Sequence, residues 1–193
     1  MDYNKILNKN ILNIINILHG KRLYFSQILE LTKIKSKNNL LKNLNILVDF
    51  KILQREKNKS NTFYKINYQN NFSQSFLQLI NAGKLQSLPF ERRSAIKDTI
   101  IETSPALAIL FGSSAKSNFK KESDIDILLI YNEKNINIKD KIKEISSRYG
   151  VRINPIIMNF SELDTRIDAT KHILKTGYPL TGQPYFYEVL KNV

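Results

Sequence analysis

The sequence predicts a two-part chain of the α+β or α/β class: a small N-terminal domain of helices with a β-hairpin, then a domain with a small mixed sheet. Three observations predict this. Apolar residues recur at helical spacing early in the chain, strands alternate with helices after residue 105, and charge is uneven. Residues 1–72 carry 13 Lys and Arg against 4 Asp and Glu, whereas residues 73–193 carry 17 against 13. The expected parts are 1–70, a connecting helix over 71–88, and 89–193.

The N-terminal part is predicted to form three helices. Apolar side chains fall on one face of the first and third segments, the pattern of a helix packed against a core. His19-Gly20 is a suitable end for the first helix, and Ser26 and Ser36 are the expected N-caps of the second and third. The predicted helices are residues 5–18, 27–32 and 37–49.

Two short segments, 52–57 and 62–67, flank Asn58-Lys59-Ser60-Asn61 and are predicted to pair as a β-hairpin. Three helices followed by a basic hairpin resemble a winged helix-turn-helix domain, whose helix after the turn enters the major groove of DNA. The resemblance implies an interface with duplex DNA, or with RNA, and its salt sensitivity would follow from phosphate contacts. The expected interface residues on the third helix, at the hairpin tip and around them are Lys37, Asn38, Asn39, Lys42, Asn43, Lys57, Lys59, Lys33, Lys35, Arg55 and Lys65.

Two other interpretations of this domain stay open. Winged-helix folds also serve as dimerisation or protein-docking modules, and a lysine-rich helix face is usually just solvated. A generally basic proteome would also produce the positive charge. We favour nucleic-acid binding because the excess of Lys and Arg is concentrated in residues 1–72.

Beyond the hairpin, the sequence predicts a connecting helix whose apolar face could form a homodimer surface. Pro89 begins the next helix and Pro105 stops it. Strands and helices then alternate to the end of the chain. The predicted elements are helices 72–86 and 89–103, strand 106–111, a short helix after Gly112, a strand after Asp126, helix 137–149, strand 151–158, a helical segment from Ser161 to Gly177, loop 178–184 and helix 185–190.

The most informative stretch joins the end of a buried strand, Leu110-Phe111, to Gly112-Ser113-Ser114 at the start of a helix. A helix start carries unpaired backbone N–H groups, which suit a polyphosphate. Asp124 and Asp126 then lead into a second strand, in which residues i and i+2 point to the same face. Adjacent carboxylates repel unless a cation lies between them, and Mg²⁺ prefers a few carboxylates plus substrate phosphates. The pattern predicts metal-assisted chemistry on a nucleoside triphosphate.

Gly112-Ser113, ten further residues and Asp124-Ile125-Asp126 resemble the signature of the minimal nucleotidyltransferases of the DNA polymerase beta-like superfamily. The resemblance covers roughly residues 90–182. It implies transfer of a nucleoside monophosphate from an NTP to a hydroxyl of RNA, a protein or a small molecule, with Mg²⁺ or Mn²⁺. The implied roles are catalytic metal ligands for Asp124 and Asp126, close backbone approach for Gly112, phosphate binding by N–H and hydroxyl for Ser113 and Ser114, and charge compensation for Lys116.

Members of that family usually carry a third carboxylate on the third strand, and the resemblance places this position near Asn154. An asparagine can offer a neutral oxygen to a metal but cannot act as a general base. Glu162 or Asp164 could move in instead. Two functions therefore stay open: a transferase, or a catalytically degenerate regulator that binds DNA and senses nucleotide or a partner protein. The family also includes toxin–antitoxin components, which makes a partner toxin or antitoxin a further expectation.

Composition excludes several classes of protein. The chain has no cysteine, which excludes disulfides and Cys-ligated zinc or iron–sulfur sites. It has neither the apolar core of a signal peptide nor an apolar run near the ~20 residues of a membrane span, so we expect a cytoplasmic protein without a membrane partner. His19 and His172 give no case for catalysis. Of Tyr178, Tyr185 and Tyr187, we expect at least two to pack in the core.

Overall fold

A computed structural model describes residues 8–116, 123–133 and 137–191. The first residues of the predicted helix 5–18, and the N-terminal segment considered for a signal peptide, lie outside the described residues. The chain divides into two compact units, Met1–Ile80 and Asn81–Val193, and the division falls within α4 (Asn71–Gln86). In the described ranges, no helix is long and apolar enough to cross a membrane.

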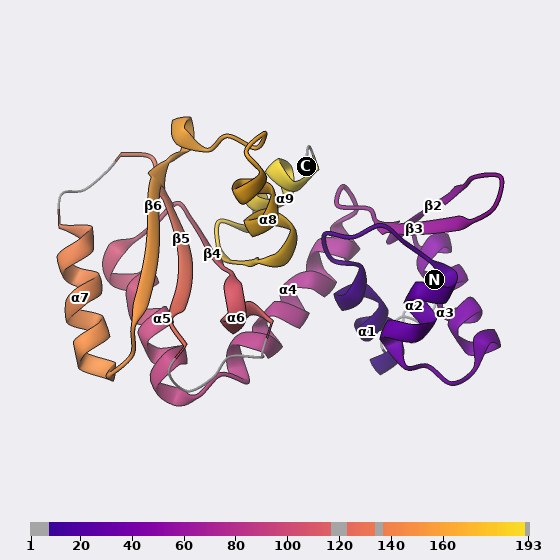
Figure 1. Cartoon of the computed structure of the whole chain (residues 1–193), viewed down its shortest axis with the longest axis horizontal. Helices are drawn as coiled ribbons and strands as arrows, with labels where there is room; N and C mark the ends of the chain where they lie inside the picture. Colours follow the sequence, from indigo (N-terminus) through magenta and orange to yellow (C-terminus); the bar gives the residue numbers. More distant parts are fainter. Residues whose placement is uncertain (1–7, 117–122, 134–136, 192–193) are drawn as a thin grey trace. The chain divides into compact units, whose positions relative to one another are not determined.

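The first unit combines helices with a small sheet (Figure 1). Its elements are α1 (Lys9–Leu18), β1 (Leu23–Tyr24), α2 (Phe25–Thr32), α3 (Lys37–Asp49), β2 (Leu53–Lys57) and β3 (Thr62–Ile66). Among the described residues, these strands form an antiparallel sheet in the order β1-β3-β2. The helices and the hairpin agree with the prediction, whereas β1 was not predicted, because a two-residue strand has no periodicity to detect.

Local sequence explains where these helices begin. Ser36 Oγ accepts a hydrogen bond of 3.2 Å from the N–H of Asn39, so Ser36 caps α3 as predicted. The prediction that Ser26 caps α2 is wrong, because α2 already begins at Phe25 and Tyr24 is its N-cap. Gln27 Oε1 accepts a bond of 3.1 Å from the N–H of Tyr24, which satisfies the helix start without a serine.

The second unit is built on a mixed sheet. Its further elements are α5 (Phe90–Thr103), β4 (Leu107–Leu110), α6 (Gly112–Ala115), β5 (Ile125–Tyr131), α7 (Ile138–Tyr149), β6 (Ile153–Asn159), η2 (Phe160–Glu162), α8 (Asp168–Thr176), β7 (Tyr178–Thr181) and α9 (Gln183–Leu190). In the described part of this unit the strand order is β6-β5-β4-β7; β5 and β6 are parallel, and the other neighbours are antiparallel. The mixed sheet predicted from the sequence is confirmed.

Two segments near the C-terminus differ from the prediction. The expected loop 178–184 contains a strand, β7, which pairs with β4 at the edge of the sheet, where Pro179 is tolerated. The expected helical segment from Ser161 is instead the short η2, and a separate helix starts at Asp168. Tyr178 and Tyr187 are buried, as expected of two of the three tyrosines, and Tyr185 is exposed.

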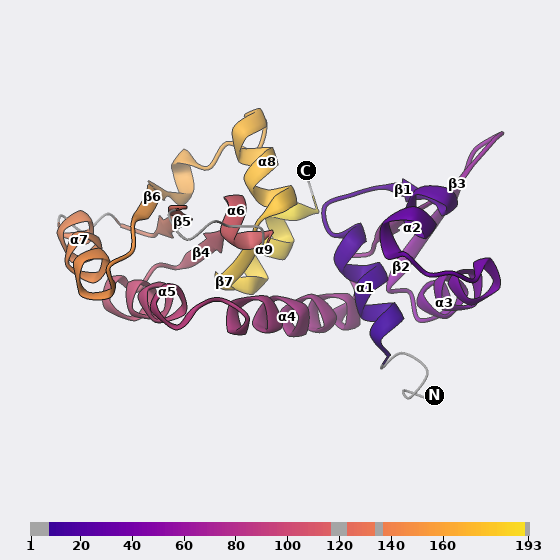
Figure 2. The same cartoon turned by 60° about the horizontal axis from the view of Figure 1, so that its bottom comes forward.

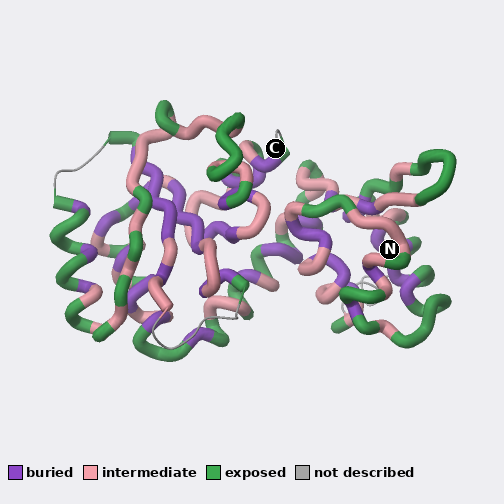
Figure 3. Tube along the Cα trace, viewed as in Figure 1, coloured by how far each residue is buried: buried purple, intermediate pink, exposed green. Residues whose placement is uncertain are grey.

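Helices α5 and α7 lie side by side and pack on one face of the sheet (Figure 2). Ile96 of α5, Ile142 of α7 and Ile127 of β5 are all buried in this layer. Figure 3 shows β4 and most of β5 as buried, whereas β6 alternates between half-buried and exposed residues. The strand that follows Asp124 is therefore a central, rigid element of the unit.

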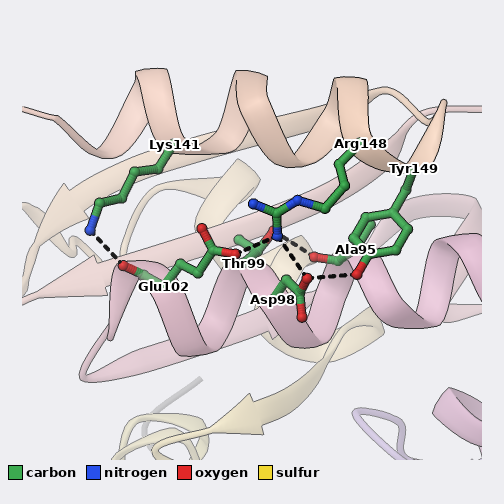
Figure 4. Close-up of polar contacts among 7 residues, drawn as sticks. All are labelled: Ala95, Asp98, Thr99, Glu102, Lys141, Arg148 and Tyr149. Atoms are coloured by element: carbon green, nitrogen blue, oxygen red, sulfur yellow. Dashed lines mark hydrogen bonds and ion pairs between the residues drawn. The ribbon is translucent and has the colours of Figure 1, made fainter.

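Polar contacts between α5 and α7 reinforce this layer (Figure 4). Arg148 Nη1 lies 3.0 Å from Asp98 Oδ2 and 2.6 Å from Glu102 Oε1, and these partners, Glu102 foremost, hold the pKa of Arg148 above its ordinary value. The hydroxyl of Tyr149 donates to Asp98 Oδ2 at 2.6 Å, and Lys141 Nζ donates to the carbonyl of Glu102 at 2.9 Å. These bonds join residues 98–102 near the end of α5 to Lys141, Arg148 and Tyr149 of α7.

Candidate active site

The turn after β4 places Gly112 against the carboxylate of Asp126. Antiparallel pairing sets Leu110 opposite Ile127, and the N–H of Phe111 donates to the carbonyl of Asp126 at 3.1 Å. Gly112 has φ +69°, and a Cβ atom built on it would lie 2.2 Å from Asp126 Oδ2. Only glycine satisfies both the backbone conformation and this approach. Gly112 is therefore required next to Asp126, and the close approach of its backbone to a nucleotide stays a prediction.

Asp124 and Asp126 lie on the same side of the chain at the start of β5. Ile125 and Ile127 are buried against α5 and α7, so alternation along the strand puts Asp126 on the opposite face. Asp124 Oδ1 is buried and, in the described residues, accepts no hydrogen bond. Arg152 Nε lies 3.1 Å from that oxygen, close enough for an ion pair but without hydrogen-bond geometry.

The neighbouring strand, β6, and the residue just before it place one side chain beside each carboxylate. Parallel pairing sets Asn154 opposite Asp126, and Asn154 Nδ2 donates to Asp126 Oδ1 at 3.0 Å. The N–H of Ile125 donates to the carbonyl of Arg152 at 2.8 Å, which brings Arg152 beside Asp124. Asn154 therefore lies directly beside Asp126 on the neighbouring strand, and its replacement of a third catalytic carboxylate stays a prediction. Arg152 was missed, although its position two residues before Asn154 could have indicated it.

Two further carboxylates were considered as replacements, and both have local partners. Glu162 Oε2 accepts a bond of 2.7 Å from the N–H of Asn159. Asp164 Oδ1 lies 3.0 Å from Arg166 Nε and accepts from the Arg166 N–H at 2.9 Å, and these bonds lower the pKa of Asp164. The described segments contain no cluster of three or more His, Cys, Asp or Glu side chains that could hold a metal.

A buried arginine, Arg92, joins the two halves of the motif, and sequence reasoning missed it. Its Nη1 donates to the carbonyl of Ser123 at 2.7 Å. Its Nη2 donates to Ser114 Oγ at 2.6 Å and to the carbonyl of Asp124 at 3.0 Å. Burial lowers the pKa of Arg92, and the charges of Asp124 and Asp126 partly oppose that shift. The available signal was a cation in the first turn of a helix, where it opposes the helix dipole.

The two serines of the turn are therefore not equivalent. Ser114 is only 1% exposed, and its Oγ accepts a bond from Arg92. The Ser114 side chain is thus buried and engaged within the protein, and its expected contact with a phosphate stays a prediction. Ser113 is half-buried, and Lys116, which follows α6, is exposed. These two side chains keep access to a ligand.

The residues expected at a nucleic-acid interface lie in the first unit. On and before α3, and at the hairpin tip, those exposed to solvent are Lys33, Lys35, Lys37, Asn38, Asn39, Lys42, Arg55, Lys57 and Lys59. The expectation that Asn43 faces outward is wrong: it is 5% exposed, and its Nδ2 donates to Asn39 O and Oδ1. Lys65 is half-buried and lies 2.6 Å from Glu56 Oε1.

Comparison with known protein families finds a match within the second unit. Residues 94–183 match the family described as Polymerase beta, Nucleotidyltransferase. The matched range includes Gly112, both carboxylates and Asn154.

Similarity also extends to one curated protein. A protein of Methanocaldococcus jannaschii that is named as a candidate protein adenylyltransferase is 39% identical over 64 residues. The aligned part is 31% of this chain, and it spans 65% of that relative's length.

Such a family generally uses a nucleoside triphosphate and a divalent metal, and the carboxylates of Asp124 and Asp126 fit the metal. Two carboxylates lie together on one face, and the buried Oδ1 of Asp124 accepts no hydrogen bond within the described residues. Carboxylate oxygens that also meet substrate phosphates are the usual ligands of Mg²⁺. Asp124 and Asp126 would hold the metal, and the expected contacts of Ser113 and Lys116 with phosphate stay a prediction.

Proposed function

We propose that this chain is a metal-dependent nucleotidyltransferase that transfers a nucleoside monophosphate from an NTP to a hydroxyl group of a protein. The observation that supports it most is the contact of Gly112 with Asp126, beside Asp124, in a domain of the nucleotidyltransferase family. The protein acceptor, and ATP as the donor, are proposed because the Methanocaldococcus relative carries the name of a protein adenylyltransferase. RNA and small-molecule hydroxyls are the other acceptors that the test separates.

In the proposed reaction, the acceptor oxygen attacks the α-phosphorus of the NTP. A new O–P bond forms, the bond to the β-phosphate oxygen breaks, and pyrophosphate leaves. Asp124 and Asp126 would hold a divalent metal, which would supply positive charge beside the α-phosphate and the departing pyrophosphate. Because the amide of Asn154 is no base, the acceptor proton passes to a carboxylate oxygen of Asp126 or to solvent. Arg152 adds a positive charge beside Asp124, where negative charge develops on the phosphate.

The test is label transfer from α-labelled ATP, GTP, CTP and UTP, with Mg²⁺ or Mn²⁺ and a cell extract. The double variant Asp124→Ala/Asp126→Ala removes both carboxylates, and Asp140→Ala removes an exposed carboxylate on α7 as a matched control. We expect protease-sensitive label with the unmodified chain and with Asp140→Ala, and none with the double variant. Nucleotide binding without transfer under either metal would contradict the enzyme and favour a nucleotide-sensing regulator.

A second proposed function concerns the first unit, which we propose binds duplex DNA as a winged helix. Its element order, its sheet order β1-β3-β2 and the excess of Lys and Arg in residues 1–72 support this. Exposed Lys37 and Lys42 on α3, and Lys57 and Lys59 at the hairpin tip, supply the charge. A partner toxin or antitoxin, or a second copy of the chain, is an alternative occupant of the same surface.

Salt-dependent binding distinguishes these occupants. For duplex DNA, each lost phosphate contact reduces the slope of log affinity against log salt by about 0.9. Lys37→Gln/Lys42→Gln should therefore reduce the slope by about 2, while Lys97→Gln, an exposed site on α5, leaves it unchanged. Equal or tighter binding of tRNA would favour an RNA ligand. A chain that binds neither nucleic acid would contradict this second function.

A further inference from the structure

Arg92 is a buried cation at the N-terminal end of a helix, where a positive charge is unfavourable. It lies in the first turn of α5, where a cation opposes the helix dipole, and it is only 4% exposed. A buried charge destabilises a protein unless hydrogen bonds compensate it. The arginine is therefore favourable here only through the groups that its guanidinium contacts.

The hydrogen-bond partners of Arg92 belong to two segments that are distant in sequence from Arg92. Both segments adjoin the carboxylates of Asp124 and Asp126. One is the turn after β4, contacted through Ser114 Oγ at 2.6 Å. The other is the segment that leads into β5, contacted through the carbonyls of Ser123 at 2.7 Å and Asp124 at 3.0 Å. One planar group thus sets the separation between the turn that carries Gly112 and the backbone that carries Asp124.

We propose that Arg92 is the positioning residue of this site: its guanidinium fixes the Gly112–Ala115 turn against the Ser123–Asp124 backbone, and thereby orients the carboxylates of Asp124 and Asp126. The role of those carboxylates toward metal and nucleotide rests on the proposed function. The positioning itself is a property of the chain without ligand. It can therefore be measured separately.

The planar shape of the guanidinium, rather than its charge, allows Arg92 to contact both segments at once. Arginine presents several N–H donors in a rigid plane, whereas a lysine ammonium is a single point on a flexible stem. Arg92→Lys therefore retains the charge but cannot reach both segments in the same geometry. Arg93→Lys is the matched control on the same helix, because Arg93 is half-buried and its Nη1 donates at 2.9 Å to the carbonyl of Gln86, away from the motif.

Backbone hydrogen exchange in the full chain without ligand gives the first readout. The N–H of Lys116 donates to Ser113 O and that of Ile125 donates to Arg152 O, so both segments contain a protected amide to follow. We expect both amides to exchange about tenfold faster or more in Arg92→Lys, the effect of losing one charged hydrogen bond. The interior of α5, α7 and the whole Arg93→Lys variant should exchange as in the unmodified chain.

Binding of Mn²⁺ with a non-hydrolysable ATP analogue gives the second readout, for Arg92→Lys, Ser114→Ala and the double variant. Because Arg92 acts partly through Ser114, the losses should be non-additive, and the double variant should be little worse than Arg92→Lys alone. Unchanged exchange at both segments, or faster exchange spread evenly over the unit, would overturn the positioning role. If the unmodified chain binds no Mn²⁺–nucleotide, the proposed function fails, while the exchange result still decides the role of Arg92.

Discussion

Asn154 Nδ2 donates a hydrogen bond of 3.0 Å to Asp126 Oδ1 across the parallel pair β5–β6. An amide donor beside a carboxylate removes the repulsion that a third acid would introduce. It also removes one charge that could bind a second metal ion. This contact gives the Asp126 carboxylate a hydrogen-bond donor in the chain without metal, and it leads to a direct test of what the third position does.

Asn154→Asp should strengthen metal binding and weaken the chain without metal. The new carboxylate would lie beside Asp126 with no cation between them, so the unfolding temperature without metal should fall. With Mn²⁺ it should rise by more than in the unmodified chain, and Mn²⁺ should bind about tenfold tighter, equivalent to about 1.4 kcal/mol. Asn154→Leu removes the donor without adding charge and should show no such gain. Thermal unfolding during Mn²⁺ titration is measured for the unmodified chain and both variants. An equal rise in unfolding temperature with Mn²⁺ in Asn154→Asp and Asn154→Leu would contradict the role of charge at position 154.

Gly112→Ala should lower the rate of transfer by about 100-fold, whereas Gly150→Ala should leave the rate unchanged. Both residues have positive φ, +69° and +61°, so both alanines share a backbone penalty of about 1–2 kcal/mol. The added Cβ meets Asp126 Oδ2 at Gly112 and nothing within 4 Å at Gly150. A carboxylate displaced by about 1 Å costs about 100-fold in rate. Transfer rates of the two variants, with their unfolding temperatures, measure this, and equal rates would show that the contact with Asp126 is unimportant.

Arg152→Ala should release Asp124 for a cation. The arginine side chain is 78% exposed, so its ion pair with Asp124 should change stability by less than about 0.5 kcal/mol. Mn²⁺ should bind several-fold tighter because a competing positive charge is gone, while the rate of transfer should fall if Arg152 faces the phosphate. Calorimetric titration measures the affinity for Mn²⁺, and a transfer assay measures the rate. Weaker Mn²⁺ binding would show that Arg152 supports the metal site instead.

Alkaline pH should destabilise the first unit through Tyr68. Burial raises the pKa of Tyr68 to about 12, although its hydroxyl accepts a bond of 2.8 Å from the N–H of Gly20. The folded chain therefore holds this proton more tightly than the unfolded chain, whose tyrosines titrate near pH 10. The contribution is complete below pH 10 and is lost as pH rises through 12, by about 3 kcal/mol.

Tyr68→Phe tests this assignment. It should reduce the free energy of unfolding by about 1 kcal/mol at neutral pH, because the N–H of Gly20 loses its partner. Above pH 10 it should lose less stability than the unmodified chain, so the two curves converge or cross. Denaturant unfolding followed from pH 8 to pH 12 gives the curves. A constant difference over that range would contradict the role of Tyr68.

The sequence was sufficient for the features that depend on local pattern. Periodicity located α3 and its cap Ser36, and the spacing of Gly112 to Asp124 and Asp126 indicated the site. It was insufficient where tertiary contacts decide. β7 pairs with β4, a partner that is distant in sequence. Arg92 and Arg152 contact Asp124 only because α5 and β6 pack beside β5. Those partners are long-range, and no local pattern reports them.

Parallel incubation of the purified chain and its acceptor fraction with α-labelled and with γ-labelled ATP tests the central claim most directly. Nucleotidyl transfer through Asp124 and Asp126 predicts α-label on the acceptor and γ-label released as pyrophosphate, both abolished by Asp124→Ala/Asp126→Ala. γ-Label on the acceptor, or α-label that persists in the double variant, would contradict the account.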